Sequence, residues 1–228
     1  MCFSAGASFG ASAVLGALSV ATLKNVKGSA QVPFAMIPLM FAVQQAAEGM
    51  LWIGLSGTEH ESWRHFPIYI FLIFAQLIWP IWVPLSIWRL EKDPTRKKIL
   101  AGLLSIGIII SVYLLYCMFV YDIKAEIHEG HIRYILNFPL AFAAISSVFY
   151  FMPTVLPLFV SSFKGMWQLG LAILSSFIVT KIYFDEHLIS VWCFFAAIIS
   201  MLILIVLILS RREADRQRNL ENESTLSQ

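Results

Sequence analysis

The stretch Phe41-Ala-Val-Gln-Gln-Ala-Ala-Glu-Gly-Met-Leu-Trp52 belongs to a long apolar segment that nonetheless carries polar side chains. Gln44 and Gln45 lie four and three residues before Glu48, and Trp52 lies four residues after it, so an α-helix would place all four on one face. A carboxylate inside an apolar span is costly unless it faces a polar interior. Glu48 is therefore the first candidate functional residue, and we assign it a catalytic role as a hypothesis.

Composition predicts that the chain lies in a lipid bilayer. Of its 228 residues, 59% are hydrophobic and 13% are charged, and the mean hydropathy is +0.77. Soluble domains carry about 25% charged residues. The net charge of +2 and the lack of a basic, aromatic-rich groove exclude nucleic-acid binding. Since CxxC, GxGxxG, P-loop and HExxH motifs are absent, the common cofactor and zinc-protease signatures assign no function.

Seven apolar segments have roughly the 20 residues that a bilayer crossing needs. The first has no basic residues before it and no cleavage site behind it, which indicates an uncleaved span. Prolines should kink the third segment and interrupt the fifth. The predicted fold is an all-α bundle of seven transmembrane helices in one domain, residues 1–210, with a polar, disordered cytoplasmic tail at 211–228. The predicted spans are 6–23, 33–55, 67–88, 99–121, 132–160, 166–184 and 187–210.

Basic residues are distributed unevenly between the two sides of this bundle. Cytoplasmic loops carry an excess of Lys and Arg, so the side with twelve of the sixteen is predicted to be cytoplasmic and the N-terminus to lie outside an inner, or plasma, membrane. The four on the outer side are Arg64, Lys124, Arg133 and Lys181. The twelve are Lys24, Lys27, Arg89, Lys92, Arg96, Lys97, Lys98, Lys164, Arg211, Arg212, Arg216 and Arg218.

Polar residues at matching depths predict a pocket that opens to the outer face. At about 1.5 Å per residue, Glu48 lies roughly 10 Å below the outer end of its span, close to the depths of Gln76 and Asn137. Such a pocket would hydrate the carboxylate. Two other interpretations compete with a pocket. The amide side chains could simply hydrogen-bond neighbouring helices, and the tryptophans could anchor the helices at the membrane–water interface. The predicted lining is Gln44, Gln45, Trp52, Gln76, Tyr116, Asn137, Trp192 and Cys193.

All five histidines fall on the predicted outer side. His128 and His131 would point the same way on a helical turn, and His187 could complete a set of ligands for a divalent metal such as Zn. The alternative is that they are ordinary polar loop residues. The odd cysteine count allows one disulfide with a free thiol, or three thiols, among Cys2, Cys117 and Cys193.

Three motifs resemble an uncharacterised family of bacterial multi-span membrane proteins, a domain of unknown function. They stand at residues 1–9 (Met-Cys-Phe-Ser-Ala-Gly-Ala-Ser-Phe), 38–52 (Gln-Gln-x-x-Glu-Gly-x-x-Trp at its end) and 190–197 (Ser-Val-Trp-Cys-Phe-Phe-Ala-Ala). The resemblance implies the fold and the membrane location but no reaction. It marks as motif positions Cys2, Ser4, Gln44, Gln45, Glu48, Trp52, Trp192 and Cys193.

A second resemblance is to seven-span, metal-dependent membrane hydrolases of the alkaline ceramidase and progestin-receptor type. It rests on span count and outer histidines; the helix-borne His-x-x-x-His pair of those proteins has no counterpart, the nearest being His128 and His131.

Two functional interpretations follow. In the first, a bound metal activates water, Glu48 is the general base, and a lipid or membrane-borne substrate is hydrolysed. In the second, the protein is a non-enzymatic subunit that binds a small ligand, senses a signal or assists assembly. Side-chain geometry separates them, because a metal enzyme needs histidines and carboxylates within ligand distance of one another.

Overall fold

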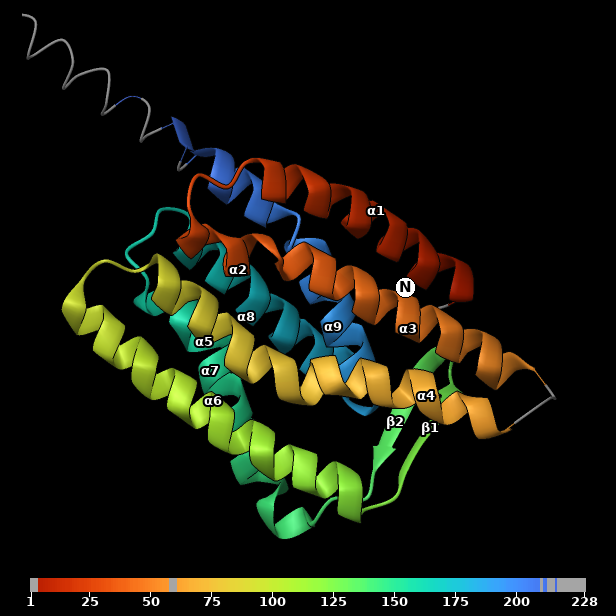
Figure 1. Ribbon diagram of the computed structural model, residues 1–228. Coiled ribbons are helices and arrows are strands. Elements are labelled where there is room, and N and C mark those ends of the chain that lie inside the picture. Colours follow the sequence, from red (N-terminus) through yellow and green to blue (C-terminus); the bar gives the residue numbers. More distant parts are fainter. Residues whose placement is uncertain (1–3, 58–60, 210, 213–215, 217–228) are drawn as a thin grey trace, which may run out of the picture.

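The computed structural model describes residues 4–57, 61–209, 211–212 and 216, and shows long helices running between the two ends of a bundle (Figure 1). A β-hairpin lies at one end, which we name the hairpin end. In chain order the elements are α1 (Ala5–Lys24), the 3-10 turn η1 (Ser29–Gln31), α2 (Val32–Ala35), α3 (Ile37–Ser56), α4 (Glu61–Leu72), the π-helix η2 (Ile73–Ile78), α5 (Trp79–Leu90), α6 (Pro94–Val120), β1 (Ile123–His128), β2 (His131–Leu136), α7 (Leu140–Val160), α8 (Met166–Tyr183), the 3-10 turn η3 (Asp185–His187) and α9 (Leu188–Ile199).

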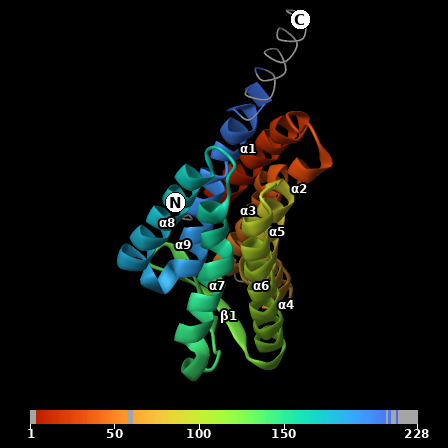
Figure 2. The ribbon, with the colours of Figure 1, turned by 90° about the vertical axis from the view of Figure 1, so that its left-hand side faces the viewer.

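Within the described residues, six helical stretches are long and apolar enough to cross a membrane. The remaining predicted span, the fifth, contains α7, which also runs between the two ends of the bundle (Figure 2), but its described apolar part, Ser147–Val160, is shorter. Length and hydropathy thus support six of the seven predicted spans. The six are Ala5–Lys24, Ser29–Ser56, His65–Leu90, Pro94–Val120, Met166–Tyr183 and Asp185–Leu209. Most of the predicted tail, 211–228, lies outside the described residues.

The hairpin corrects two sequence-based predictions, that the fold is all-α and that a span begins at residue 132. β1 and β2 pair antiparallel from Ile123 opposite Leu136 to His128 opposite His131. The turn residues Glu129 and Gly130 have φ of 49° and 76°, the positive values of the tight turns that suit a hairpin. Residues 132–136 therefore form a strand because a turn of this kind folds them back on 123–128.

The hairpin covers the core at its end of the bundle. Ile123, Ile132 and Tyr134 are buried in a cluster with side chains of α3, α4, α6 and α9, and Tyr134 stacks on Phe71 with ring centroids 4.9 Å apart. A larger apolar cluster fills the rest of the bundle, from Leu15 to Leu207. The hairpin is therefore part of the packed structure of the bundle.

The middle of one helical stretch is a π-helix, η2, between α4 and α5. A π-helix widens the backbone by about one residue per turn and leaves carbonyl groups for other partners. Two of these carbonyls are used: Tyr150 Oη donates to the oxygen of Ala75, and Ser111 Oγ donates to that of Leu77 at 2.8 Å. Helices α6 and α7 are thereby joined to η2, and Gln76 lies between the two bonded carbonyls.

The opposite end, which we name the basic end, holds the α1–α2, α5–α6 and α7–α8 turns (Figure 1). The Glu91 carboxylate, in a residue 2% exposed, joins two of these turns. It accepts hydrogen bonds from Ser162 Oγ at 2.6 Å, Ser162 N at 2.7 Å, Lys92 N at 2.9 Å and Asp93 N at 3.0 Å. Burial raises the pKa of Glu91, but these four donors outweigh it and lower the pKa from 4.5 to about 2.

Candidate functional site

The Glu48 carboxylate lies inside the bundle, in a residue with 0% exposure. Ser190 Oγ, on α9, donates to Glu48 Oε1, and Gln45 Nε2 donates to Glu48 Oε2 at 3.3 Å. Gln45 is one helical turn before Glu48, whereas Ser190 is 142 residues away in sequence. The carboxylate thus joins α3 to α9 by accepting hydrogen bonds from both helices.

Gln44, on the same buried helix face, joins α3 to α5. Trp79 Nε1 donates to Gln44 Oε1 at 2.9 Å, and the Trp79 ring stacks on Phe41 with centroids 4.1 Å apart. Gln44, Gln45 and Glu48 are all completely buried. We call Gln44, Gln45, Glu48, Trp79 and Ser190 the buried polar network. It links three helices in the position where the sequence predicted a pocket.

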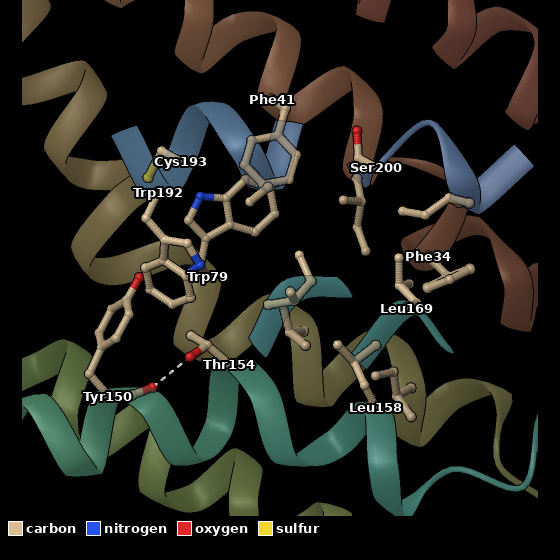
Figure 3. A pocket seen from close by; sticks show the side chains of 16 residues that line it. Phe34, Phe41, Trp79, Tyr150, Thr154, Leu158, Leu169, Trp192, Cys193 and Ser200 are labelled. Carbon is tan, nitrogen blue, oxygen red and sulfur yellow. Dashed lines mark hydrogen bonds between the residues drawn. The ribbon is translucent and has the colours of Figure 1, made fainter. Parts of the chain in front are cut away.

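Two cavities lie beside this network. The inner cavity, about 80 Å³, has a lining of aliphatic and aromatic side chains with few polar atoms. In Figure 3, Tyr150, Trp192 and Cys193 stand at one end of it, and Phe34, Leu158 and Leu169 at the other. Trp79 and Cys193 line it, whereas Glu48 does not. Of the polar network, Trp79 is thus part of the cavity wall, and the other four members do not line the cavity.

The second cavity is larger, about 350 Å³, and is enclosed by η2, α6, α7, α8, α9 and the segment that follows β2. We name it the hairpin-end cavity. Its lining contains Gln76 and Lys181 among aromatic and aliphatic side chains. Tyr150, Trp192 and Cys193 line both cavities, so these three side chains form the partition between them.

Gln76 is the amide that the π-helix brings to the hairpin-end cavity. Its side chain is half-buried, and within the described part of the chain no hydrogen bond to it is formed. Lys181, by contrast, already has a partner, because its ammonium group pairs with the Asp185 carboxylate. The polar groups that the cavity offers thus include the unengaged Gln76 amide, the unpartnered Nε1 of Trp192 and the ammonium group of Lys181, which is paired with a carboxylate.

The three histidines predicted as metal ligands do come together at the hairpin end. The His187 ring centroid lies 5.6 Å from that of His128 and 4.9 Å from that of His131. His131 Nδ1 is 2.9 Å from the carbonyl oxygen of Glu129, and the His128 backbone hydrogen-bonds the His187 ring. Among the described residues, no group of three or more His, Cys, Asp or Glu side chains has an arrangement that could hold a metal ion. The predicted metal site is therefore not supported.

Arg133 links this cluster to its surroundings. Its guanidinium lies 2.7 Å from both Glu186 and Glu126, and the Glu186 hydrogen bond raises the pKa of Arg133. His128 Nδ1 is 3.8 Å from the same Glu186 carboxylate. The histidines thus lie in a local network of rings and ion pairs that connects the hairpin to the start of α9.

The remaining predicted pocket residues divide into two groups. Gln76, Trp192 and Cys193 line the hairpin-end cavity. Tyr116 is 59% exposed on the outside of α6, Asn137 lies exposed in the loop after β2, and Trp52 is buried in the apolar cluster beneath the hairpin. Neither Tyr116 nor Asn137 lines either cavity. Their predicted depths gave no information on the direction in which a side chain points, and Asn137 precedes the helix in which it was placed.

Sequence reasoning did not assign Ser190, Trp79 or Tyr150 to the site. Ser190 precedes Cys193 by three residues, so a helix carries both on one face, and this spacing was an available signal. Trp79 and Tyr150 gave no such signal, because their partners are 35 and 75 residues away in the sequence.

The fold and the site define a class: a mostly helical protein with the apolar, membrane-length helices of an integral membrane protein, a buried carboxylate network and a ligand-sized cavity. Within that class, the chain belongs to the family of unknown function DUF6629, which matches residues 1–219. The family membership predicted from the sequence motifs is thereby confirmed. No curated protein and no solved structure matches the chain.

Proposed function

We propose that this protein binds a small, mostly apolar ligand inside the membrane, in the hairpin-end cavity. The observation that carries the proposal is the cavity itself, about 350 Å³ in volume and enclosed by membrane-length helices. Ligand sites are typically clefts of about 300–1,000 Å³ with apolar walls and a few placed polar groups. The walls here are largely aromatic and aliphatic, and Gln76 is the placed polar group.

The buried polar network supports binding more than hydrolysis. Its carboxylate is enclosed by Ser190 and Gln45 and lines neither cavity, so it is not positioned to take a proton from a substrate there. A general base must lie within hydrogen-bond reach of the proton that it removes. We assign Glu48 a positioning role: it holds α9 against α3 and thereby places Trp192 and Cys193 in the partition.

We also propose an orientation for this site. The basic end carries the excess of Lys and Arg, so it faces the cytoplasm and the hairpin end faces outward across a plasma membrane. In this arrangement α7 is also a crossing, the fifth of seven along the chain, because it connects the two ends of the bundle (Figure 2). A ligand would then reach the cavity from the outer half of the bilayer or from the outer surface.

The test is to identify the small molecules that stay with the protein when it is extracted from its native membrane. Leu188 lines the cavity and is partly buried, so Leu188→Trp should fill part of the ligand space. Ile182, 67% exposed on α8, provides the matched control, Ile182→Trp. Native mass spectrometry of the three proteins is expected to show a bound species in the parent chain and in Ile182→Trp, reduced at least tenfold in Leu188→Trp.

Equal retention of every species by the two tryptophan variants would contradict the proposal, since ordinary surface lipid does not depend on the cavity. Circular dichroism and size-exclusion profiles of the variants establish that both are folded before retention is compared.

A further inference from the structure

The chemistry of the cavity wall narrows the class of ligand. We infer that the hairpin-end cavity is built for a flat ring that carries carbonyl oxygens, the chemistry of a membrane quinone headgroup. This inference rests on the proposed function. It is carried by the kinds of side chain that line the cavity, by the charge balance within it, and by the one amide that has no protein partner.

Aromatic rings form much of the wall. They meet one another at angles: Phe177 lies 5.1 Å from Trp192 and 5.0 Å from Phe151, with interplanar angles of 69° and 51°. Tyr150 meets Trp192 edge-on at 6.2 Å. Ring faces and edges set at such angles offer both stacking and edge contacts to a flat guest. The aromatic lining residues are Tyr113, Phe138, Tyr150, Phe151, Phe177 and Trp192.

The polar groups of the lining favour a neutral acceptor. Gln76 can donate through its amide nitrogen. The ammonium group of Lys181 has three N–H donors and is paired with the Asp185 carboxylate. Among the described residues that line the cavity there is no Asp or Glu, so no carboxylate there would pair with a cationic ligand. The pairing of Lys181 with Asp185 also removes the net positive charge that would select a carboxylate. A carbonyl oxygen fits this balance, since it accepts hydrogen bonds without bringing charge into an apolar interior.

The π-helix fixes the backbone around this amide. Ala75 and Leu77 accept hydrogen bonds from Tyr150 and Ser111. These two contacts hold the backbone on either side of Gln76 and satisfy the two hydroxyl groups. The Gln76 side chain lacks a partner in the described structure, and the buried Trp192 Nε1, which also lines the cavity, is a second unpartnered donor there.

The experiment compares three small probes on the full chain in lipid nanodiscs, with empty discs as the blank. Menadione has a flat ring and two carbonyl groups, 2-methylnaphthalene has a similar ring without them, and decanoate has a carboxylate on a flexible chain. Equilibrium dialysis measures saturable binding of each. We expect menadione to bind at least tenfold more tightly than either comparator.

Two variants locate the recognition. Gln76→Leu should weaken menadione binding about tenfold and leave 2-methylnaphthalene unchanged, because one hydrogen bond to the ring carbonyl is lost. Gln168→Leu, on an exposed residue of α8 outside both cavities, is the matched control and should bind as the parent chain does.

The outcomes separate this inference from the proposed function. Equal binding of menadione and 2-methylnaphthalene, or equal binding by the two glutamine variants, overturns carbonyl recognition. If decanoate binds more tightly than menadione, the inference of a flat-ring ligand is wrong and a single-chain lipid is favoured. The proposed function still holds in that case if Leu188→Trp blocks the binding of decanoate. If no probe binds and Leu188→Trp retains every native species, both proposals fail.

Discussion

Two buried carboxylates mark the two regions of this bundle, and they are stabilised differently. Glu91, at the basic end, accepts four hydrogen bonds, three of them from backbone N–H groups. Glu48, deep in the bundle, accepts hydrogen bonds from the side chains of Ser190 and Gln45 among its contacts. Backbone donors are present in any sequence that makes the same turn, whereas side-chain donors depend on the identity of two other residues. The first carboxylate therefore stabilises turns, and the second fixes which helices pack together.

Removing the negative charge of Glu91, at the basic end, is expected to have the largest effect on stability. In Glu91→Gln, the amide nitrogen would face N–H donors, and the ionised acceptor is lost. The drop of the pKa from 4.5 to about 2 corresponds to about 3 kcal/mol of stability. The free energy of unfolding of the variant, measured in mixed detergent, should be lower than that of the parent chain by about this amount. Asp122→Asn, at a side chain 64% exposed, is the control and should change stability by less than about 0.5 kcal/mol. A loss no greater than the control's would refute the role of Glu91.

The same carboxylate predicts a pH dependence. Because the folded pKa is lower than the unfolded one, its contribution is complete above about pH 4.5 and is lost as the pH falls toward about 2. We expect up to about 3 kcal/mol of stability to disappear across this interval in the parent chain. The Glu91→Gln variant should have a flatter profile over the same range. Parallel profiles for the two proteins would show that other acids account for the loss.

At the deeper carboxylate, Ser190→Ala should destabilise the protein by about 2 kcal/mol, since it removes the hydroxyl that donates to the buried Oε1 of Glu48. The double variant with Glu48→Gln tests the coupling. If the two side chains act through one hydrogen bond, Ser190→Ala should cost at least about 1 kcal/mol less in the Glu48→Gln background. Additive losses would mean that Ser190 and Glu48 stabilise the bundle independently.

The smallest effect on stability is expected at Gln76, which has no hydrogen-bond partner in the described structure. Gln76→Leu should change the free energy of unfolding by less than about 0.5 kcal/mol, or increase it slightly, because an apolar side chain replaces an unengaged amide. Thermal unfolding of the ligand-free protein measures this. A loss of 2 kcal/mol or more would show that Gln76 supports the fold, and would weaken its assignment to a ligand.

The sequence predicted the apolar helices well because a bilayer crossing requires a long apolar run, which can be counted. It missed the hairpin because Ile132 to Leu136 are mostly apolar and were joined to the apolar run that begins at Leu140. The Glu129-Gly130 turn before this strand, and Asn137 and Pro139 after it, were the available signals of a boundary. At the site, residue counting gave similar depths for Gln76 and Asn137, but of these two only Gln76 lines the cavity. Partners such as Ser190 for Glu48 depend on how distant helices pack, which a single sequence does not specify.

The π-helix at Ile73–Ile78 has a further consequence for how this chain can change by mutation. Such a turn holds about one residue more than an α-helix of the same rise, and each residue of an α-helix advances the chain by about 100°. Because the wide turn absorbs that one extra residue, loss of a single codon within 73–78 would restore an α-helix without the 100° rotation of α4 relative to α5 that a deletion in an ordinary α-helix causes. The helix would still cross the bundle, but a different side chain would take the place of Gln76. One in-frame deletion would therefore alter the specificity of the cavity while sparing the architecture around it.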